Sequence, residues 1–417
     1  MSRLKLVAMA MFFSLSSFAN AAKTLDEVLE LAYKNNPELN SNRELIAAEE
    51  ALIVSKATLE DPMIGFSNLN RNMETQYGTI TQKFRFPVKY VYQAKMQKSR
   101  FESQKSNLEI KRFAVRQKVT SLYYSIYSTQ KLIELTMANM QAVKEFARVA
   151  EKKYAAGKSP QGDSMKAHFE LTQLELDLLR LQQEEGSLQS YLKAVLNDQR
   201  MVDLHLEKMD VRIPIIALKD IGTSVSEVEA KLERSSPRIR AENQMLLEAD
   251  YARKLAQWEF APDFQLQYQQ RISGEPTDSK IYSVGMTVPL WFWKKSSEAT
   301  AASAKKMARE YQLQDVKQKA MALVNDLKGK VDTGLKTLKI YETSLIPQAQ
   351  GAYNSSRAAY RANKTSFLDL LDSERSLYRV KTGFFKALRQ YVDQLGELES
   401  QLGENISNLT GNHEVMK

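Results

Sequence analysis

Residues 154–171 read YAAGKSPQGDSMKAHFEL, and residues 360–377 read YRANKTSFLDLLDSERSL. The two stretches align at an offset of 206 residues. In each, a short break interrupts segments of helical periodicity, which predicts two helical hairpins with related tips. The tip residues are Gly157, Lys158 and Ser159 in the first copy and Asn363, Lys364 and Thr365 in the second.

The same resemblance continues toward the N-terminus at slightly smaller offsets. Pro37 matches Pro237, Asp61-Pro62 matches Ala261-Pro262, and Phe86-Pro87 matches Val288-Pro289. Several matches in the same order indicate one structural unit that has been duplicated. We therefore expect a first repeat at 22–223, a second repeat at 224–405 and a C-terminal tail at 406–417.

Each repeat contains two runs in which apolar and polar residues alternate. In the second repeat Tyr282, Val284, Met286 and Val288 interleave with polar or small residues. Period two over about ten residues predicts strands, at about 263–271 and 281–289 here and at about 63–70 and 77–86 in the first repeat.

After the second strand, each repeat shows helical periodicity over about 100 residues. The predicted hairpins cover about 90–197 and about 296–402, with outbound helices of about 90 Å at 1.5 Å per residue. The apolar positions of the return helices step by three and four, which is typical of coiled coils. They are Leu171, Leu174, Leu178, Leu181, Leu188, Leu192 and Val195 in one repeat, and Leu377, Phe384, Leu388, Tyr391, Leu395, Leu398 and Leu402 in the other.

Composition excludes several classes of protein. The 417 residues include no Cys and three scattered His, so disulfides, thiol catalysis, a lipidated cysteine and a metal cluster are not expected. The net charge of +9 contains no long basic block, which argues against a nucleic-acid partner. We expect no cofactor, no metal site, and no enzymatic activity, because no nucleophile and base occur together in a recognisable motif.

The first 21 residues have the order of features of a secretory signal peptide. Arg3 and Lys5 precede an apolar run from Leu6 to Phe18, and Ala19-Asn20-Ala21 follows as a small-x-small cleavage pattern. Cleavage after Ala21 is expected, so the mature chain is predicted to be exported.

The four predicted strands are too few for one chain to close a barrel in lipid, because an open sheet leaves unpaired edges there. Three copies would supply twelve strands and three pairs of helical hairpins. The expected fold is therefore mainly α with a small β part, in a homotrimer whose β-barrel continues into an α-helical barrel. Five aromatic residues follow or end the strands, where an interfacial girdle belongs: Phe84, Phe86, Trp291, Phe292 and Trp293.

The chain resembles the TolC family of outer-membrane efflux channels over nearly all of its mature length. The resemblance is carried by the duplication, by Asp61-Pro62-Met63 before the first strand, by Phe86-Pro87 after the second and by the tip motif 360–377. The segments LEDPMIGFSNLN and FRFPVKYVYQAK look most like the branch that serves heavy-metal resistance-nodulation-division pumps.

This resemblance implies a homotrimer in outer-membrane lipid with a long periplasmic extension, which docks onto a periplasmic adaptor (membrane fusion) protein and an inner-membrane pump. The channel would conduct cargo such as metal cations or drugs passively. In the family, acidic residues near the tips form cation-attracting constrictions, and the matching positions are Asp369, Asp372 and Asp163. The six tip residues would contact the adaptor. Family members usually carry Gly where this chain has Asn363, and many metal-branch relatives are lipoproteins, whereas this chain lacks the cysteine.

Three alternatives remain open from the residues alone. Asp369 and Asp372 are three apart on one helix face, which also fits an ordinary solvated helix start. The long hairpins alone would fit a structural periplasmic coiled-coil or adaptor protein, although the alternating strands argue against it. A type I secretion channel would share this outer component, so the cargo stays undefined by sequence.

Overall fold

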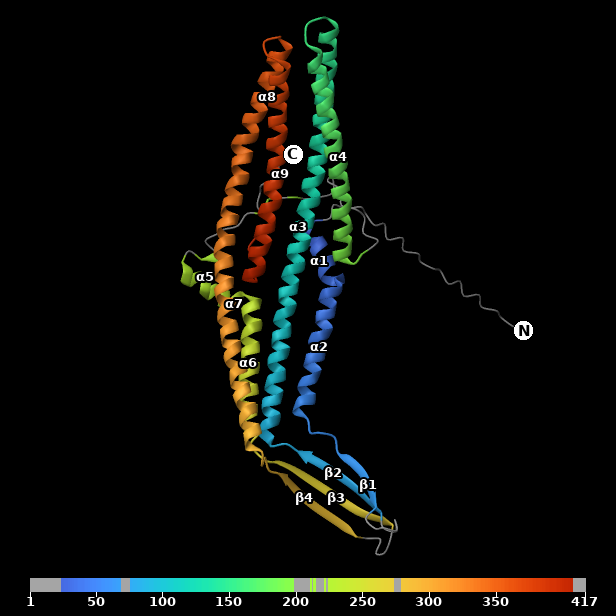
Figure 1. Ribbon diagram of the computed structural model, residues 1–417, viewed down its shortest axis with the longest axis vertical. Coiled ribbons are helices and arrows are strands. Elements are labelled where there is room, and N and C mark those ends of the chain that lie inside the picture. Colours follow the sequence, from blue (N-terminus) through green and yellow to red (C-terminus); the bar gives the residue numbers. More distant parts are fainter. Residues whose placement is uncertain are drawn as a thin grey trace, which may run out of the picture.

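The computed structural model describes residues 24–68, 76–198, 224–273 and 279–407, together with five residues between 211 and 222. The predicted signal peptide (1–21), the loop around 71–75 and most of the tail lie outside these residues. The described chain is a long bundle with a small sheet at one end and two helical hairpin tips at the other (Figure 1). It is mainly helical with one antiparallel sheet, as predicted.

Both repeats begin with the same pair of short helices. α1 (Leu25–Asn35) and α2 (Pro37–Ala57) open the first, and α5 (Val225–Ser235) and α6 (Pro237–Trp258) open the second. Thr24 and Ser224 each form a capping box with a glutamate three residues later, Glu27 and Glu227. The proline that follows each first helix becomes the first residue of the next, where its missing N–H is tolerated.

The long hairpins differ in one respect. The first consists of α3 (Pro87–Ala155) and α4 (Gln161–Leu196), and α3 is continuous over 69 residues. The outbound path of the second runs through α7 (Phe292–Ile340), a π-helical segment η3 (Tyr341–Leu345) and α8 (Ile346–Arg361), and α9 (Phe367–Leu402) returns. From the aligned Pro289 to Arg361 is 73 residues, four more than α3, and the π turn holds one residue more than an α turn.

The sheet consists of β1 (Met63–Asn68), β2 (Gln76–Phe84), β3 (Asp263–Ser273) and β4 (Lys280–Thr287). All neighbours are antiparallel, in the order β1-β2-β3-β4, so the central pair joins the two repeats. The register aligns Ile64, Ile80, Tyr268 and Tyr282 in one row across the sheet. Directly paired residues share a face, so the predicted apolar side of β4 is continuous over all four strands.

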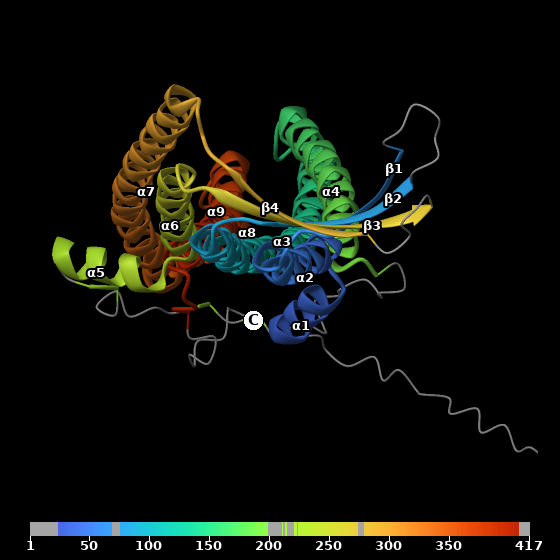
Figure 2. The ribbon, with the colours of Figure 1, turned by 90° about the horizontal axis from the view of Figure 1, so that it is seen from below.

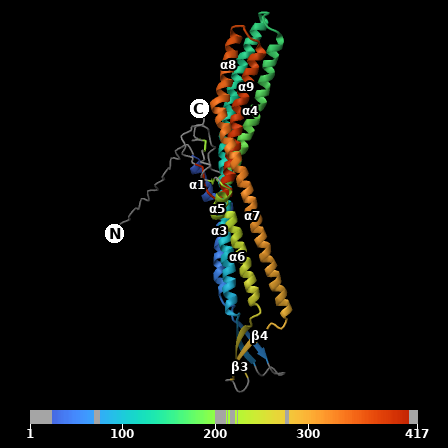
Figure 3. The same ribbon diagram turned by 90° about the vertical axis from the view of Figure 1, so that its left-hand side faces the viewer.

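The apolar face of the sheet is exposed in the single chain. Phe66, Tyr282 and Val284 keep 79%, 77% and 76% of their side-chain surface accessible. The opposite face carries polar residues, including the paired Gln267 and Ser283. In Figures 1 and 3 the sheet extends beyond the helices, which leave both of its faces uncovered.

The helices stand side by side in the same order as the strands. Next to the sheet, α2 packs on α3, α3 on α6, and α6 on α7. Because α2 leads into β1, β2 into α3, α6 into β3 and β4 into α7, each strand continues one helix. Figure 2, seen along the bundle, shows the helices in a curved row rather than a closed globule. Within the described residues, no helix is both long and apolar enough to cross a membrane.

A buried lysine fixes the junction between helix and sheet. Lys89 is 1% exposed, and its Nζ donates to Asp263 Oδ1 at 2.8 Å and to the Ala261 carbonyl oxygen at 3.0 Å. Asp263 Oδ1 also accepts from the Phe86 backbone N–H at 2.9 Å. A buried cation needs such pairing, so these contacts hold α3 of the first repeat against β3 of the second.

Candidate functional site

The two hairpin tips have the same backbone geometry. Gly157 and Asn363 both adopt the left-handed conformation, with φ of 67° and 55°. At each tip, the backbone N–H groups of this residue and of the lysine after it donate to carbonyl oxygens in the last turn of the preceding helix. The donors are Gly157 and Lys158 at the first tip, and Asn363 and Lys364 at the second. This is a Schellman motif, which satisfies the free carbonyl groups at a helix end.

Asn363 therefore fills the role that glycine has at the first tip. Apart from glycine, asparagine is the residue that adopts the left-handed conformation most readily. The departure from the family pattern at this position thus leaves the turn unchanged and adds a side chain to it.

The predicted aspartates do not share one environment. Asp369 closes the N-terminal capping box of α9: its Oδ2 accepts from Thr365 Oγ1 at 2.8 Å and from Ser366 Oγ at 2.7 Å. Hydrogen bonds from Ser366, and then from Thr365, lower the pKa of the Asp369 carboxyl below its ordinary value. Asp369 thus caps its own helix, as the alternative of an ordinary helix start predicted, while remaining exposed and charged.

Asp372 is the freer of the two α9 aspartates. Its side chain is 76% exposed, and its nearest cation is the Arg375 guanidinium at 3.9 Å. Asp163 lies at the matching start of α4, where Pro160 is the N-cap and offers no side-chain oxygen for a capping box. Burial raises the pKa of the Tyr360 phenol, and the negative charge of Asp163 raises it further. Asp163 of the first hairpin therefore lies near Tyr360 of the second.

Lys153 joins the two tips, a contact that the sequence analysis missed. Its Nζ lies 3.8 Å from the centre of the Tyr360 ring and donates to Asn363 Oδ1 at 2.9 Å. The Tyr360 ring is buried and packs edge-on against Phe367 at 5.9 Å. A cation over an aromatic face is attracted by the ring quadrupole, so Lys153 holds α3 and α8 together. We call Lys153, Tyr360 and Asn363 the tip clasp.

Ion pairs between α4 and α9 continue the connection away from the tip. Arg375 Nε donates to Glu170 Oε2 at 2.9 Å, and Arg389 Nη1 donates to Glu184 Oε1 at 2.8 Å. Both pairs join residues 205 positions apart. Sequence periodicity gives no direct sign of such pairs, because either partner alone resembles a solvated helix position.

The predicted interfacial aromatics gather where strands meet helices. Trp291, Phe292 and Trp293 are 63%, 65% and 56% exposed, and the centre of the Trp293 ring lies 5.3 Å from the ring centre of each of the other two. Phe86 instead stacks on Trp258 at 5.4 Å, which covers part of its ring. Phe84 pairs with Phe264 across β2 and β3. All five residues lie at the helix end of the sheet.

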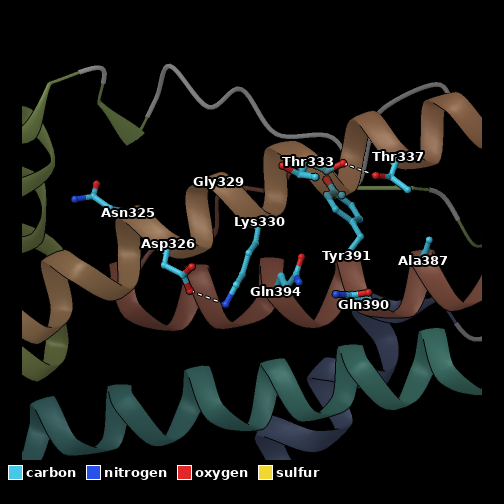
Figure 4. A pocket seen from close by; sticks show the side chains of 11 residues that line it. Asn325, Asp326, Gly329, Lys330, Thr333, Thr337, Ala387, Gln390, Tyr391 and Gln394 are labelled. Carbon is cyan, nitrogen blue, oxygen red and sulfur yellow. Dashed lines mark hydrogen bonds and ion pairs between the residues drawn. The ribbon is translucent and has the colours of Figure 1, made fainter.

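The described surface also carries a cavity of about 520 Å³ between α7 and α9, drawn in Figure 4. Lys330 and Asp326, one turn apart on α7, form an ion pair at 2.6 Å at its edge. Tyr391 of α9 points into the cavity, and Gly334 of α7 leaves room for its ring. The Tyr391 hydroxyl donates to the Pro214 carbonyl oxygen at 2.5 Å. These contacts tie the segment between the repeats to the bundle, and the lining residues offer no nucleophile with an adjacent base.

Comparison with known proteins gives one family and a consistent set of relatives. Residues 230–404 match the family described as "Outer membrane efflux protein". A curated relative, the cobalt-zinc-cadmium resistance protein CzcC of Cupriavidus metallidurans, is 20% identical over 393 residues, which cover 91% of this chain and 90% of the relative.

Solved structures share the fold over the same span. The outer-membrane channel OprN superposes with a TM-score of 0.78 at 16% identity, covering 91% of this chain and 90% of that one. The Campylobacter jejuni CmeC outer membrane channel gives 0.77 at 16% identity, covering 91% and 85%. CusC gives 0.76 at 14% identity, covering 91% and 92%.

The matched family is described as outer membrane efflux proteins, and the solved neighbours OprN and CmeC are outer-membrane channels, which are not enzymes. The family match covers most of the second repeat, and the structure repeats the same elements in the first. The second repeat thus matches the outer membrane efflux protein family, and the chain as a whole has the fold of the outer-membrane channels OprN and CmeC and is similar in sequence to CzcC.

Proposed function

We propose that the chain forms a homotrimeric channel that conducts its cargo passively across the outer membrane as the outer component of a tripartite efflux system. The observation that carries this proposal is the open sheet whose strands continue the helices in the same order. Its edge strands β1 and β4 have no partner on their outer sides within the described residues. An unpaired sheet edge is not tolerated in lipid, so β1 of one copy is expected to pair with β4 of the next.

Apolar residues at the edges of the helical row support the same assembly. Leu45 and Leu52 on α2 are 50% and 41% exposed, and Met307 and Tyr311 on α7 are 53% and 66% exposed. α2 and α7 are the two ends of the row, so one subunit would bring α2 against α7 of its neighbour. A head-to-tail contact of this kind closes into a ring when the curvature permits, and three copies give twelve strands.

The faces of the sheet fit a membrane wall around water. The row Ile64, Ile80, Tyr268 and Tyr282 would face hydrocarbon, and Gln267 and Ser283 would face the lumen. The exposed Trp291, Phe292 and Trp293 would lie at the periplasmic interface. The chain would reach the outer membrane after removal of the signal peptide at 1–21, without lipid attachment.

The tips would be the periplasmic end, where an adaptor protein and an inner-membrane pump of the resistance-nodulation-division type would connect. Adaptor contacts are expected at Gly157, Lys158 and Ser159 and at Asn363, Lys364 and Thr365. Asp163, Asp369 and Asp372 would line the constriction and attract cations. Metal cations are the cargo that we favour, because the curated relative CzcC is named for cobalt, zinc and cadmium resistance.

The test measures the oligomeric state and the ion conduction of one purified preparation. Detergent-purified protein should have the mass of a trimer and should form ion-conducting channels in planar bilayers. A monomer or dimer that conducts would contradict the proposal, as would a trimer that never conducts even with its tips opened by mutation. Export of cobalt, zinc or cadmium from cells that express the chain with its neighbouring genes would test the cargo.

A further inference from the structure

Glu374 is a buried carboxyl in the small hydrophobic core just below the tips. It lies in α9 and is 4% exposed, between Leu370 and Leu377 on the same helical stripe. The spacing of four and three places it on a coiled-coil seam, where an apolar residue is expected. The core around it combines both hairpins: Phe146, Ala147 and Ala150 from α3, Ala167 from α4, Tyr353 and Tyr360 from α8, and Phe367, Leu370, Leu371 and Leu377 from α9.

One oxygen of this carboxyl has no hydrogen-bond partner. Glu374 Oε2 is inaccessible to solvent and makes no hydrogen bond in the described part of the chain. The residue lines a cavity of about 230 Å³ between α3, α8 and α9. A buried carboxylate without a partner is unstable, whereas a carboxylic acid is far less costly to bury.

The surrounding charges do not offset this cost. From α4 the nearest charge is that of Glu170, which repels a second carboxylate. Arg375, the next residue of α9, donates to Glu170 through two nitrogens, and it lowers the pKa of Glu374 by less than burial and Glu170 raise it. Lys381, about two turns further along α9, lines the cavity without forming an ion pair with Glu374. Burial, and then Glu170, raises the pKa of Glu374 to about 8.

The remaining neighbours include one further cation, Arg357 of α8, whose Nε makes no hydrogen bond in the described part of the chain and which forms no ion pair with Glu374. From α8, Tyr353 lines the cavity, and Arg357 lies near that phenol. The Tyr378 hydroxyl of α9 is hydrogen-bonded to Thr136 at 2.8 Å. α3 contributes Leu135, Ala138, Asn139 and Ala142 to the cavity, and none of these four can titrate.

We propose that Glu374 is a proton-dependent latch, whose neutral carboxyl permits the two hairpins to pack together and whose ionisation favours their separation. The latch regulates the entrance described above, so its meaning for conduction rests on the proposed function. When the hairpins separate, Glu374 gains access to water and its carboxylate is no longer penalised by burial. Closure is therefore coupled to uptake of a proton by each subunit.

The direction of the pH dependence follows from linkage. The closed state holds the proton up to a pKa of about 8, and the water-exposed carboxyl holds it only to its ordinary value of 4.5. Closure is strongest below the exposed value and weakens as pH rises through the interval, by up to about tenfold in the closed-to-open ratio per pH unit and subunit. Above the closed-state pKa the ratio no longer changes.

The experiment measures tip separation directly. The chain has no native cysteine, so Lys158→Cys and Lys364→Cys introduce unique spin-label sites at the two tips. Mixing labelled subunits with an excess of unlabelled ones before assembly leaves one labelled subunit per trimer. The inter-label distance should shift toward a longer population between pH 5 and pH 8.5.

The isosteric variant Glu374→Gln should remove this shift and remain in the short-distance population at every pH. Asp393→Asn, which removes an exposed carboxyl on the same helix, should retain it. An unchanged distance in the parent from pH 5 to pH 8.5 would overturn the latch even where Glu374→Gln fails to assemble, and so would a pH response that persists in Glu374→Gln. Because this readout needs no conduction, its result is separable from that of the bilayer test of the proposed function.

Discussion

The ammonium group of Lys153, in the last turn of α3, lies 3.8 Å from the centre of the Tyr360 ring, in the last turn of α8. This contact and the hydrogen bond to Asn363 join two hairpins that are otherwise connected near their tips mainly by apolar packing. Replacing Lys153 by Met should weaken the junction by about 1–2 kcal/mol per subunit. We expect a larger or more frequently open conductance in planar bilayers.

Lys152→Met is the matched control for the clasp. Lys152 is exposed and forms no ion pair in the described part of the chain, and its loss removes the same charge from the same turn. If the two variants raise conductance equally, the effect comes from the charge of the tip and not from the contact with Tyr360.

Two substitutions at Asn363 separate the turn from the clasp. Asn363→Gly should keep the left-handed turn, at a φ of 55°, while losing the oxygen that accepts from Lys153. Asn363→Ala loses the same oxygen and adds strain of about 1 kcal/mol, because alanine tolerates this conformation poorly. Thermal unfolding followed by circular dichroism should rank Ala below Gly. Equal unfolding midpoints for the two variants would show that the backbone of the turn relaxes and removes the strain.

The register of β4 predicts which residues meet lipid. Val284 is paired with Leu266 on the apolar face, and Ser283 is paired with Gln267 on the other. Val284→Arg should cost about 2–4 kcal/mol if it lies near the bilayer midplane, whereas Ser283→Arg should cost much less. Heat-modifiable trimer recovered from outer membranes measures both. Similar losses would mean that the faces are assigned the wrong way round or that the sheet does not enter the membrane.

Asp372 offers the sharper test of cation selectivity. Its carboxylate is exposed and makes no capping hydrogen bond, so Asp372→Asn changes charge without disturbing the start of α9. We expect the reversal potential in a salt gradient to move toward zero, and further with Asp369→Asn added. Asp315→Asn, an exposed aspartate of α7 far from the tips, should leave selectivity unchanged.

The contribution of Asp369 to cation preference should be lost only at a pH below the ordinary pKa of an aspartate. Its pKa is lowered by the hydrogen bonds of the capping box, so the stability that the charged cap confers is present above the ordinary value of 3.8 and is lost as pH falls through the lower, folded value. Cation preference due to Asp369 should therefore persist at pH 4 in an Asp372→Asn background. Its loss already at pH 5 would contradict the cap geometry as the source of the charge.

Much of the architecture could be predicted because it depends on periodic patterns. Alternation in 280–287 gives a strand, and the spacing of Leu377, Leu388 and Leu395 gives a coiled-coil helix. The strand order and the continuation of each strand into a helix follow from the duplication once the register is known. The tip turns were also readable, since glycine and asparagine mark left-handed positions.

The contacts between the repeats could not be predicted in the same way. Lys153 meets Asn363, 210 positions away, and a lysine near a helix end has many possible partners. For Asp369 the sequence leaves both a constriction residue and an ordinary helix start open, and the Ser366-x-x-Asp369 spacing before an apolar run is typical of the capping box that the structure shows. The sequence does indicate an unusual position for Glu374, because it places a carboxylate on the helical stripe that includes Leu370 and Leu377.

The π segment at Tyr341–Leu345 bears on how the two halves diverged after duplication. Between the aligned prolines, Pro87 and Pro289, and the aligned tip tyrosines, Tyr154 and Tyr360, the second path is four residues longer than the first. The wider π turn gives the residues beyond it another angular phase than an uninterrupted α-helix would. The aligned tyrosines at the two tips differ in burial: Tyr360 is 6% exposed and Tyr154 is 47% exposed. The π turn therefore lies in the path that ends at the buried tyrosine, and the uninterrupted α3 leads to the exposed one.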